Sequence, residues 1–165
     1  MAGNDGNDRF AGRIHSGVTT YSGGYGSDTL DYSGATGAVT ASLDIGDGND
    51  IVTEIERLIG SQYADTLLGN ALDNVLNGGF GNDTIAGGFG DDLIVYAGGE
   101  DIVMGGDSND TLDYSGLGSA IDADLSKTTQ SVTTGDSTDW TTGVQRVLTT
   151  LPDSDVESVI GTDYD

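Results

Sequence analysis

Aliphatic side chains recur every nine residues through the middle of the chain, each two positions after an acidic or amide residue. The acidic or amide column contains Asp65, Asn74, Asp83, Asp92, Asp101 and Asp110, and the aliphatic column contains Leu67, Leu76, Ile85, Ile94, Val103 and Leu112. The residues between them are rich in glycine, asparagine and aspartate, which favour turns because glycine adopts positive φ and Asx side chains satisfy turn backbone. The aliphatic positions suit very short strands. The pattern therefore predicts a very short strand in the two or three residues after each acidic or amide position.

A turn and a short strand together make half a coil, so two nonapeptides predict one 18-residue coil of a flattened roll. Turns that start at 60, 78 and 96 are expected to stack along one edge, and turns that start at 69, 87 and 105 along the other. The predicted fold is all-β: a parallel β-roll, which is a β-helix-like solenoid, with β excursions.

Stacking of the coils brings acidic side chains close together. Strands of a sheet lie about 4.8 Å apart, so Asp83 and Asp101 are expected at adjacent levels of one edge, and Asp92 and Asp110 at adjacent levels of the other. Two like charges about 4 Å apart repel by roughly 4 kcal/mol at an effective dielectric of 20. A divalent cation between them turns this repulsion into attraction, and glycine-rich turns leave main-chain carbonyl oxygens free to complete its shell. The spacing predicts a row of cation sites.

The composition narrows the choice of partner. The chain has 165 residues, a formal net charge of −23, 28 glycines, one histidine (His15) and no cysteine. This charge disfavours nucleic acid and anionic membrane surfaces, which require basic patches, and no apolar run is long enough for membrane insertion. Without thiols or a histidine cluster, oxygen ligands remain, and calcium accepts mixed carboxylate and carbonyl shells. Only 35% of residues are hydrophobic, so bound ions are expected to supply stability that a thin core does not.

The repeats at 78–86 and 87–95, GGFGNDTIA and GGFGDDLIV, fit the pattern GGxGxDxUx. In this they resemble the nonapeptides of RTX proteins, which form calcium-binding parallel β-rolls. The resemblance implies several calcium ions lodged between consecutive turns, in a bacterial type I secretion substrate that folds outside the cell or at its surface. The predicted ligands are Asp28, Asp65, Asp83, Asp92, Asp101 and Asp110, with the turn residues Gly78, Phe80, Gly81, Gly87, Phe89, Gly90, Gly99, Gly105 and Asp107.

A longer duplication organises the chain. GGYGSDTLDYSG at 23–34 matches GGDSNDTLDYSG at 105–116, and IERLIGSQY at 55–63 matches VESVIGTDY at 156–164. These matches divide the chain into a first module at 1–59, a core run of six nonapeptides at 60–116, and a second excursion with a truncated next module at 117–165. We expect TLDYSG to end a run of turns, with Tyr32 and Tyr114 covering the end of the roll. Asp8 is a candidate stacking partner for Asp28, and the turn with Asp47 and Asp50 is a further acidic turn.

An excised, non-catalytic segment of a larger secreted protein is the favoured interpretation. HExxH and GxSxG motifs do not occur, and the nine-residue spacing explains the paired carboxylates without a glycosidase site. Residues 127–150 alternate as in β strands and contain Trp140, which suggests either a carbohydrate contact or packing of the insert onto the roll. Two alternatives therefore stay open: an adhesin or surface-layer segment that binds carbohydrate, and an accessory module of a polysaccharide-active enzyme. Neighbouring modules of the same chain are further possible partners.

Overall fold

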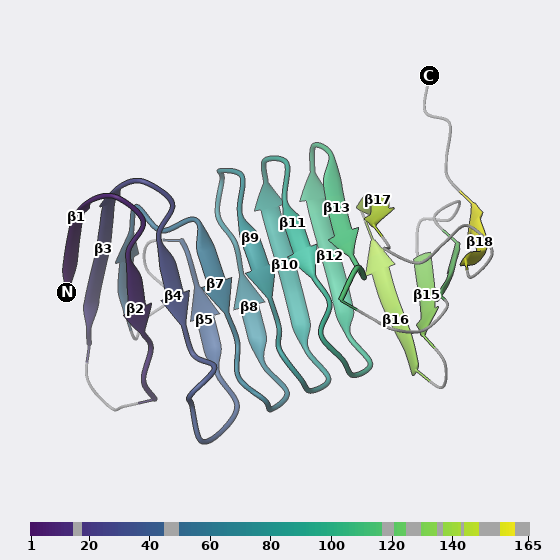
Figure 1. Ribbon diagram of the computed structural model, residues 1–165, viewed down its shortest axis with the longest axis horizontal. Coiled ribbons are helices and arrows are strands. Elements are labelled where there is room, and N and C mark those ends of the chain that lie inside the picture. Colours follow the sequence, from purple (N-terminus) through teal and green to yellow (C-terminus); the bar gives the residue numbers. More distant parts are fainter. Residues whose placement is uncertain are drawn as a thin grey trace.

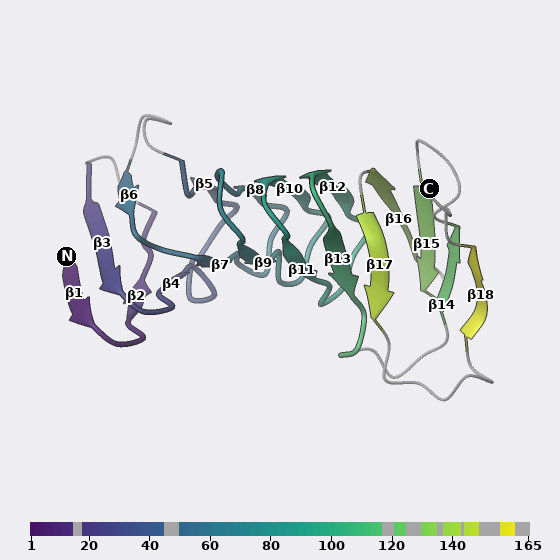
Figure 2. The same ribbon diagram turned by 90° about the horizontal axis from the view of Figure 1, so that it is seen from above.

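The chain forms a roll of parallel strands, shown from the side in Figure 1 and from above in Figure 2. The computed structural model describes residues 1–14, 18–44 and 50–116 with their side chains, and beyond them the backbone of five strands. Within these described residues there is no helix long and apolar enough to cross a membrane. The predicted all-β parallel roll is confirmed.

One face of the roll is a single seven-stranded sheet. In spatial order its strands are β2 (Arg9–Ala11), β4 (Thr29–Asp31), β7 (Arg57–Ile59), β9 (Val75–Asn77), β11 (Leu93–Val95), β13 (Asp110–Asp113) and β17 (Val144–Leu148). All of its neighbouring strands are parallel.

The opposite face consists of two separate sheets. The first contains β1 (Ala2–Asp5), β3 (Thr20–Tyr25) and β6 (Ile51–Thr53). The second runs in the order β5 (Thr40–Ser42), β8 (Thr66–Leu68), β10 (Thr84–Phe89), β12 (Ile102–Asp107), β16 (Ser137–Thr142), β15 (Gln130–Thr134), β14 (Ile121–Asp124) and β18 (Val156–Ile160). Strand β5, and not β6, lies beside β8. The excursion at 32–50 therefore separates the two sheets of this face (Figure 2).

The register confirms the coil of two nonapeptides. Ile85 lies beside Leu67 and Val103 in one sheet, and Ile94 lies beside Leu76 and Leu112 in the other. The turns at 60–65, 78–83 and 96–101 therefore lead from the seven-stranded face to the opposite face, and those at 69–74, 87–92 and 105–109 lead back. The two predicted edges of the roll are confirmed with them.

The core is a narrow file of side chains between the two faces. The central residue of each three-residue strand points inward, and so does the aliphatic residue of the repeat in the longer strands β10, β12 and β13, because a strand places alternate side chains on opposite sides. Among the file members Leu30, Leu58, Leu67, Leu76, Ile85, Ile94, Val103 and Leu112, none is more than 2% exposed. Each coil thus contributes two aliphatic side chains, which is a small apolar area for its length.

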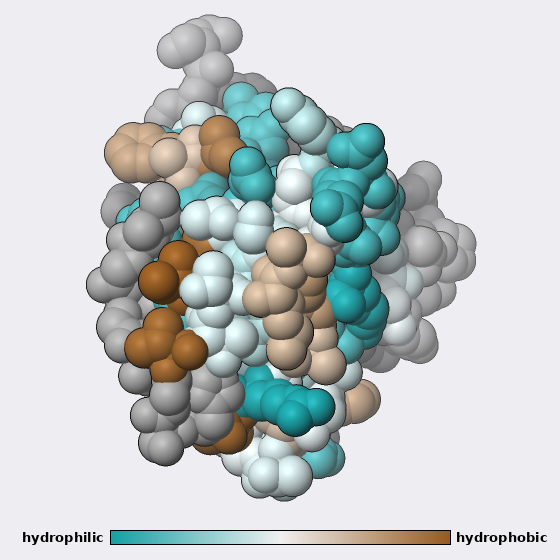
Figure 3. All heavy atoms as spheres, turned by 90° about the vertical axis from the view of Figure 1, so that its left-hand side faces the viewer, coloured by the Kyte–Doolittle hydropathy of each residue, from teal (hydrophilic) through white to brown (hydrophobic). Residues whose placement is uncertain are grey.

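The N-terminal end of the roll has a mixed surface. Figure 3 looks onto this end, where apolar residues lie in small separate groups between polar ones. Exposed large apolar residues in this quarter of the sequence include Met1, Ile14, Val18 and Tyr25. Scattered exposed apolar residues are ordinary on folded proteins and do not by themselves mark an interface.

The excursions differ in part from expectation. Residues 127–150 form strands as predicted, and β15 and β16 pair as an antiparallel hairpin. The matching segments around 57–59 and 156–160 both form strands, but β7 lies inside the seven-stranded sheet and β18 lies at the edge of the other face. The division into 1–59, 60–116 and 117–165 stays a prediction, since the seven-stranded sheet takes strands from all three segments.

Tyr32 and Tyr114 do not cover the end of the roll, so this prediction was wrong. Each follows a strand that has a neighbour on both sides, because β4 lies between β2 and β7 and β13 lies between β11 and β17. Both side chains are buried inside the roll. The ring of Tyr114 packs on that of Tyr96, one coil earlier, with 4.6 Å between the ring centres. The tyrosines therefore contribute to the core rather than to a cap.

Candidate metal centre

Two rows of acidic and amide side chains run along the edges of the roll, at the residue that begins or directly precedes each strand. We call them the inner rows. One row contains Asp8, Asp28, Glu56, Asn74, Asp92 and Asp110, and the other contains Asp65, Asp83 and Asp101. Asp28, Asp65, Asp83, Asp92, Asp101 and Asp110 are between 0% and 3% exposed. Such complete burial of carboxylates is rare unless they are paired with other groups.

Main-chain N–H groups of the neighbouring coil account for one oxygen of several inner carboxylates. The N–H of Asp65 donates to Oδ1 of Asp83 at 2.8 Å, and the N–H of Asp83 donates to Oδ1 of Asp101 at 2.8 Å. On the other edge, the N–H of Asp92 donates to Oδ1 of Asp110 at 3.0 Å. Each coil is thereby bonded to the carboxylate of the coil that follows it. Sequence analysis predicted that the carboxylates stack but did not predict these bonds.

The second oxygen is left for another partner. Within the described residues, Oδ2 of Asp83 and Oδ2 of Asp92 are buried and accept no hydrogen bond. A buried carboxylate oxygen without a partner costs free energy, because it has lost its hydration. Oδ2 of Asp92 and the carbonyl oxygen of Gly105 both lie within 3.0 Å of the point where a β-carbon on Gly87 would stand. A carboxylate oxygen and a main-chain oxygen from successive coils thus converge on a space kept open by glycine.

The first two nonapeptides close the same space with their own side chains. In the turn 60–65, the N–H of Ser61 donates to Oδ2 of Asp65, and Oγ of Ser61 donates to its Oδ1 at 2.9 Å. In the turn 69–74, the N–H of Asn70 donates to Oδ1 of Asn74 at 2.8 Å. Asp65 was predicted as a ligand, yet both of its oxygens already accept hydrogen bonds. The spaces beside Asp83 and Asp92 are therefore better cation sites than those beside Asp65 and Asn74.

The remaining predicted turn residues lie around these spaces. The side chains of Phe80 and Phe89 are 67% and 61% exposed, and the ring of Phe80 lies near Gly98 of the next turn on its edge. Gly81 contributes a carbonyl oxygen that lies against Gly99 of the next coil, and Gly90 packs against the main chain of Leu72. Gly78 packs against the carboxylate of Asp83, whereas Asp107 is exposed. Gly81, Gly90 and Gly99 have φ of 133°, 100° and 118°, which side chains rarely tolerate.

A second, outer row of polar side chains precedes the inner rows by one residue. Oδ1 of Asp73 accepts the N–H of Asp91 at 2.9 Å, and Oδ1 of Asp91 accepts the N–H of Asn109 at 3.0 Å. These side chains are exposed, so water solvates their other oxygens. The outer row therefore holds the turns in register without the desolvated charge of the inner rows.

Burial changes the acidity of the inner carboxyls. Burial raises the pKa of Asp83 from its ordinary 3.8 to about 6, against the N–H of Asp65, which lowers it. Burial likewise raises the pKa of Asp92 to about 6, and the negative charges of Asp110, Asp73 and Asp91 add to the effect. The pKa of Asp110 is raised as well, mainly by burial. These carboxyls favour a bound proton where no cation is present.

The raised pKa values predict opposite pH dependences with and without calcium. In calcium-free buffer Asp83 and Asp92 bind more protons in the folded form than in the unfolded form. Their protonation therefore stabilises the fold fully below about pH 4, and this stabilisation is lost as the pH rises through about 6. Circular dichroism without calcium should therefore show more β structure at pH 5 than at pH 7.5. With calcium the midpoint concentration should rise as pH falls below 6, because protons compete with the ion. The double variant D83N/D92N should lose most of both trends, and unchanged trends in it would contradict the assignment.

Two further acids belong with the carboxylate rows: Glu56, which the sequence analysis did not name, and Asp50, which it placed in a further acidic turn. Oε2 of Glu56 accepts the N–H of Asp28 at 2.9 Å, and Oδ1 of Asp50 accepts the N–H of Thr19 at 2.8 Å. Both precede an aliphatic residue by two positions, as the predicted acids do. Glu56 lies nine residues before Asp65 and so continues the register, whereas Asp50 lies outside it. The predicted pairing of Asp28 with Asp8 agrees with the geometry, since the N–H of Asp8 donates to Oδ1 of Asp28 at 2.7 Å. Asp47 and His15 lie outside the described residues.

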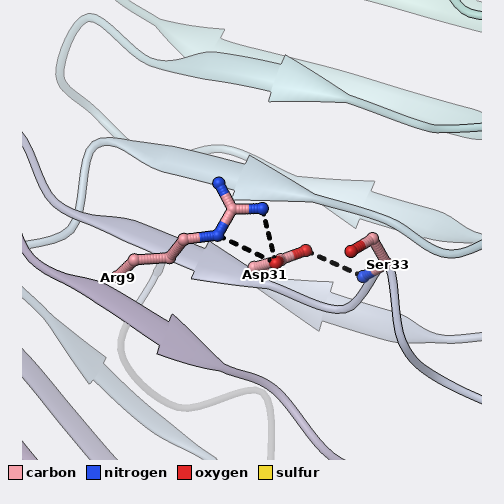
Figure 4. Close-up of polar contacts among 3 residues, drawn as sticks. All are labelled: Arg9, Asp31 and Ser33. Carbon is pink, nitrogen blue, oxygen red and sulfur yellow. Dashed lines mark hydrogen bonds and ion pairs between the residues drawn. The ribbon is translucent and has the colours of Figure 1, made fainter.

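The duplicated turn TLDYSG has a structural explanation in its aspartate. Oδ1 of Asp31 accepts the N–H of Ser33 at 2.8 Å, and Oδ2 accepts hydrogen bonds from Nε and Nη2 of Arg9 at 3.0 and 2.6 Å (Figure 4). Asp113 repeats the first of these bonds with the N–H of Ser115 at 2.8 Å. The Arg9 side chain is 60% exposed, so its ion pair is worth little beyond holding β2 beside β4. Neither aspartate belongs to the inner rows.

No three His, Cys, Asp or Glu side chains converge into a group that would hold a metal ion by themselves, as far as the described residues extend. The spaces beside Asp83 and Asp92 combine one carboxylate with main-chain oxygens instead, which is a donor set that calcium accepts. Residues 59–94 and 95–113 match the family model of the RTX calcium-binding nonapeptide repeat, in four copies. No curated protein matches the chain.

Proposed function

The chain carries RTX calcium-binding nonapeptide repeats at residues 59–113, and from this premise we propose that it is a structural module that folds around calcium outside the cell. The proposal includes a larger type I-secreted bacterial protein, of which this chain is one non-catalytic segment. The observation that carries it is the pair of buried Oδ2 atoms of Asp83 and Asp92, which accept no hydrogen bond within the described residues.

The residues present fit a calcium ion better than other common metals. Carboxylate and carbonyl oxygens are hard ligands, and calcium tolerates the irregular geometry that main-chain turns provide. Asp92 and Gly105 would hold one ion beside Gly87, and Asp83 would hold another beside Gly78. When bound, calcium supplies positive charge that neutralises these desolvated carboxylates. Asp101 and Asp110 support the arrangement by accepting the N–H groups of Asp83 and Asp92.

The negative charge of the chain supports folding that depends on the calcium concentration around it. With a net charge of −23 and a core of two aliphatic side chains per coil, the chain gains little on folding without cations. Extracellular calcium modules bind with dissociation constants of about 10⁻⁴ to 10⁻³ M. Sites of this strength stay empty in a cytosol and fill outside it. The same chain would then remain unfolded before export and fold after it.

The alternative functions gain no support from the described residues. A carbohydrate-binding role was suggested by Trp140, which lies in β16, but the side chains of this segment are outside the described part of the structure. An accessory role beside an enzyme was suggested by the general family context alone. We therefore propose calcium-dependent folding as the function, with neighbouring modules of the parent chain as its partners.

Calorimetric titration with calcium tests the proposal. The wild-type chain is expected to bind several ions at millimolar calcium or below, and D92N is expected to bind fewer, because an amide in place of the buried carboxylate removes its charge. D91N provides the matched control: it makes the same change one residue away on an exposed side chain, and should bind as many ions as the wild type. A wild-type chain that binds no calcium at 10 mM, or equal losses in D91N and D92N, would contradict the proposal.

A further inference from the structure

A cavity of about 230 Å³ lies outside the repeats, at the edge of the roll beside the first excursion. Its lining residues are 13–14, 32, 38–40 and 50. Two connections that contribute to it, 12–19 and 32–39, are longer than the nonapeptide turn 60–65. None of the lining residues belongs to the matched repeats. The cavity is therefore a feature of the excursion rather than of the calcium-binding turns.

Two opposite charges line this cavity, on Arg13 and Asp50. The ion pair found among the described residues joins Arg9 to Asp31, so Arg13 and Asp50 do not neutralise each other by direct contact. Both charges act on the same group, Tyr21. Burial raises the pKa of the Tyr21 hydroxyl, the charge of Asp50 adds to this rise, and the charge of Arg13 opposes it. A ligand that carries both signs of charge would match this lining.

The carboxylate of Asp50 is held in place before any ligand binds. Its Oδ1 accepts the N–H of Thr19 at 2.8 Å, and the hydroxyl of the buried Tyr32 donates to its Oδ2 at 3.3 Å. A group that is already ordered loses less conformational freedom on binding. A carboxylate has about four acceptor positions, so Asp50 can accept further hydrogen bonds from a cationic group of a ligand.

The edge of β5 adds main-chain groups to the cavity. Among the described strands β5 pairs with β8 alone. The carbonyl oxygen of Val39 and the N–H of Leu43 bond to residues beside β8 and in it. Main-chain groups of successive residues in a strand point to alternate sides, so those of Thr40 point away from β8. Thr40 is a lining residue, and its main chain therefore offers a donor and an acceptor to a ligand.

The size and charge of the site limit what it can hold. A cavity of about 150 Å³ holds benzene, whereas pockets for drug-sized ligands begin at about 300 Å³, so this cavity suits a molecule of intermediate size. Ile14, Ala38 and Val39 give it an apolar part. The net charge of −23 repels simple anions, but a zwitterion avoids this repulsion because it has no net charge.

We propose that this cavity binds a free α-amino acid with an apolar side chain. The carboxylate of the ligand pairs with Arg13, whose planar guanidinium suits carboxylates. Its ammonium group donates to Asp50 and to the carbonyl oxygen of Thr40, and its side chain contacts Ile14 and Val39. This binding goes beyond the proposed folding around calcium, since it uses no residue of the matched repeats.

Calorimetric titration of the calcium-loaded chain with L-leucine tests this site. We expect a dissociation constant of about 1 mM or below. Isoamylamine lacks the carboxylate of leucine and isocaproate lacks its ammonium group, and each should bind at least about tenfold more weakly. Equal binding of leucine and either analogue would overturn the proposal. Tighter binding of methyl glucoside, a neutral polyhydroxyl compound, would overturn it as well.

R13Q removes the charge that pairs with the carboxylate of the ligand and should weaken leucine binding at least about tenfold. R57Q is the matched control, because it makes the same change on an exposed arginine of β7 outside the cavity, and should bind leucine as the wild type does. Both variants should keep the calcium stoichiometry of the wild type. Equal leucine affinities in R13Q and R57Q would contradict the assignment. A wild type that binds calcium but not leucine would overturn this inference alone, whereas one that binds no calcium would overturn the proposed function.

Discussion

In excess chelator at neutral pH, the chain is expected to lose most of its β-sheet circular dichroism and to regain it cooperatively on addition of millimolar calcium. The physical reason is the desolvated charge of the inner rows, where the described carboxylates lie one coil apart and several retain a buried oxygen without a hydrogen bond. The aliphatic file contributes only two side chains per coil, so burial of apolar surface does not outweigh this cost together with the loss of chain entropy.

Magnesium provides the control for the chelator experiment. It requires nearly ideal octahedral geometry and gives up its water slowly, so it should restore little of the signal at the same concentration. Sodium chloride at equal ionic strength should restore little as well, since screening alone does not reach buried carboxylates. A chain that keeps its full β-sheet signal in chelator at pH 7.5 would show that the ions are not required for folding.

Gly87→Ala is expected to raise the calcium concentration at the midpoint of folding by at least tenfold, which corresponds to about 1.4 kcal/mol per bound ion. The added β-carbon would overlap Oδ2 of Asp92 and the carbonyl oxygen of Gly105, the two oxygens that converge on the proposed ion. The variant changes no charge, so its effect reports the shape of the site alone.

Gly34→Ala is the matched control for this substitution. A β-carbon on Gly34 would have no heavy atom of the described residues within 4 Å, and its φ is not in the left-handed range. Its midpoint should stay within about twofold of the wild type, since surface substitutions of this kind usually change stability little. Equal midpoints for the two variants would mean that the space beside Gly87 holds no ion. Calcium titration followed by circular dichroism measures both.

The nine-residue spacing predicted the coil, its two edges and the inward aliphatic file, because each of these follows from which residue types recur and how far apart. Leu67, Ile85 and Val103 share a column in the sequence and lie side by side in one sheet. Periodic side-chain chemistry of this kind fixes the register of a solenoid with few alternatives.

The features that the sequence did not predict depend on contacts made by segments that do not follow the regular repeat. Asp50 joins the carboxylate rows from outside the register, and Glu56 joins them from a segment that lacks the glycines of the repeats. Ser61 closes its turn through a hydrogen bond that the family pattern does not contain. Ser108 adopts φ of 88° at the position where the matched turns have glycine. A serine there does not indicate a left-handed backbone, so the sequence did not predict this conformation. The burial of Tyr32 required knowledge that β4 has neighbours on both sides, which the sequence alone did not provide.

The bonds of the inner rows all point the same way along the roll, and this gives the structure a polarity. The N–H of one coil depends on a carboxylate that belongs to the next coil toward the C-terminus, from Asp65 to Asp83 and from Asp83 to Asp101. A lesion at one aspartate therefore deprives the main chain of the preceding coil rather than its own. Loss of one inner carboxylate is therefore expected to destabilise the coil on its N-terminal side, so the stability of each coil depends on the coil that follows it in the sequence.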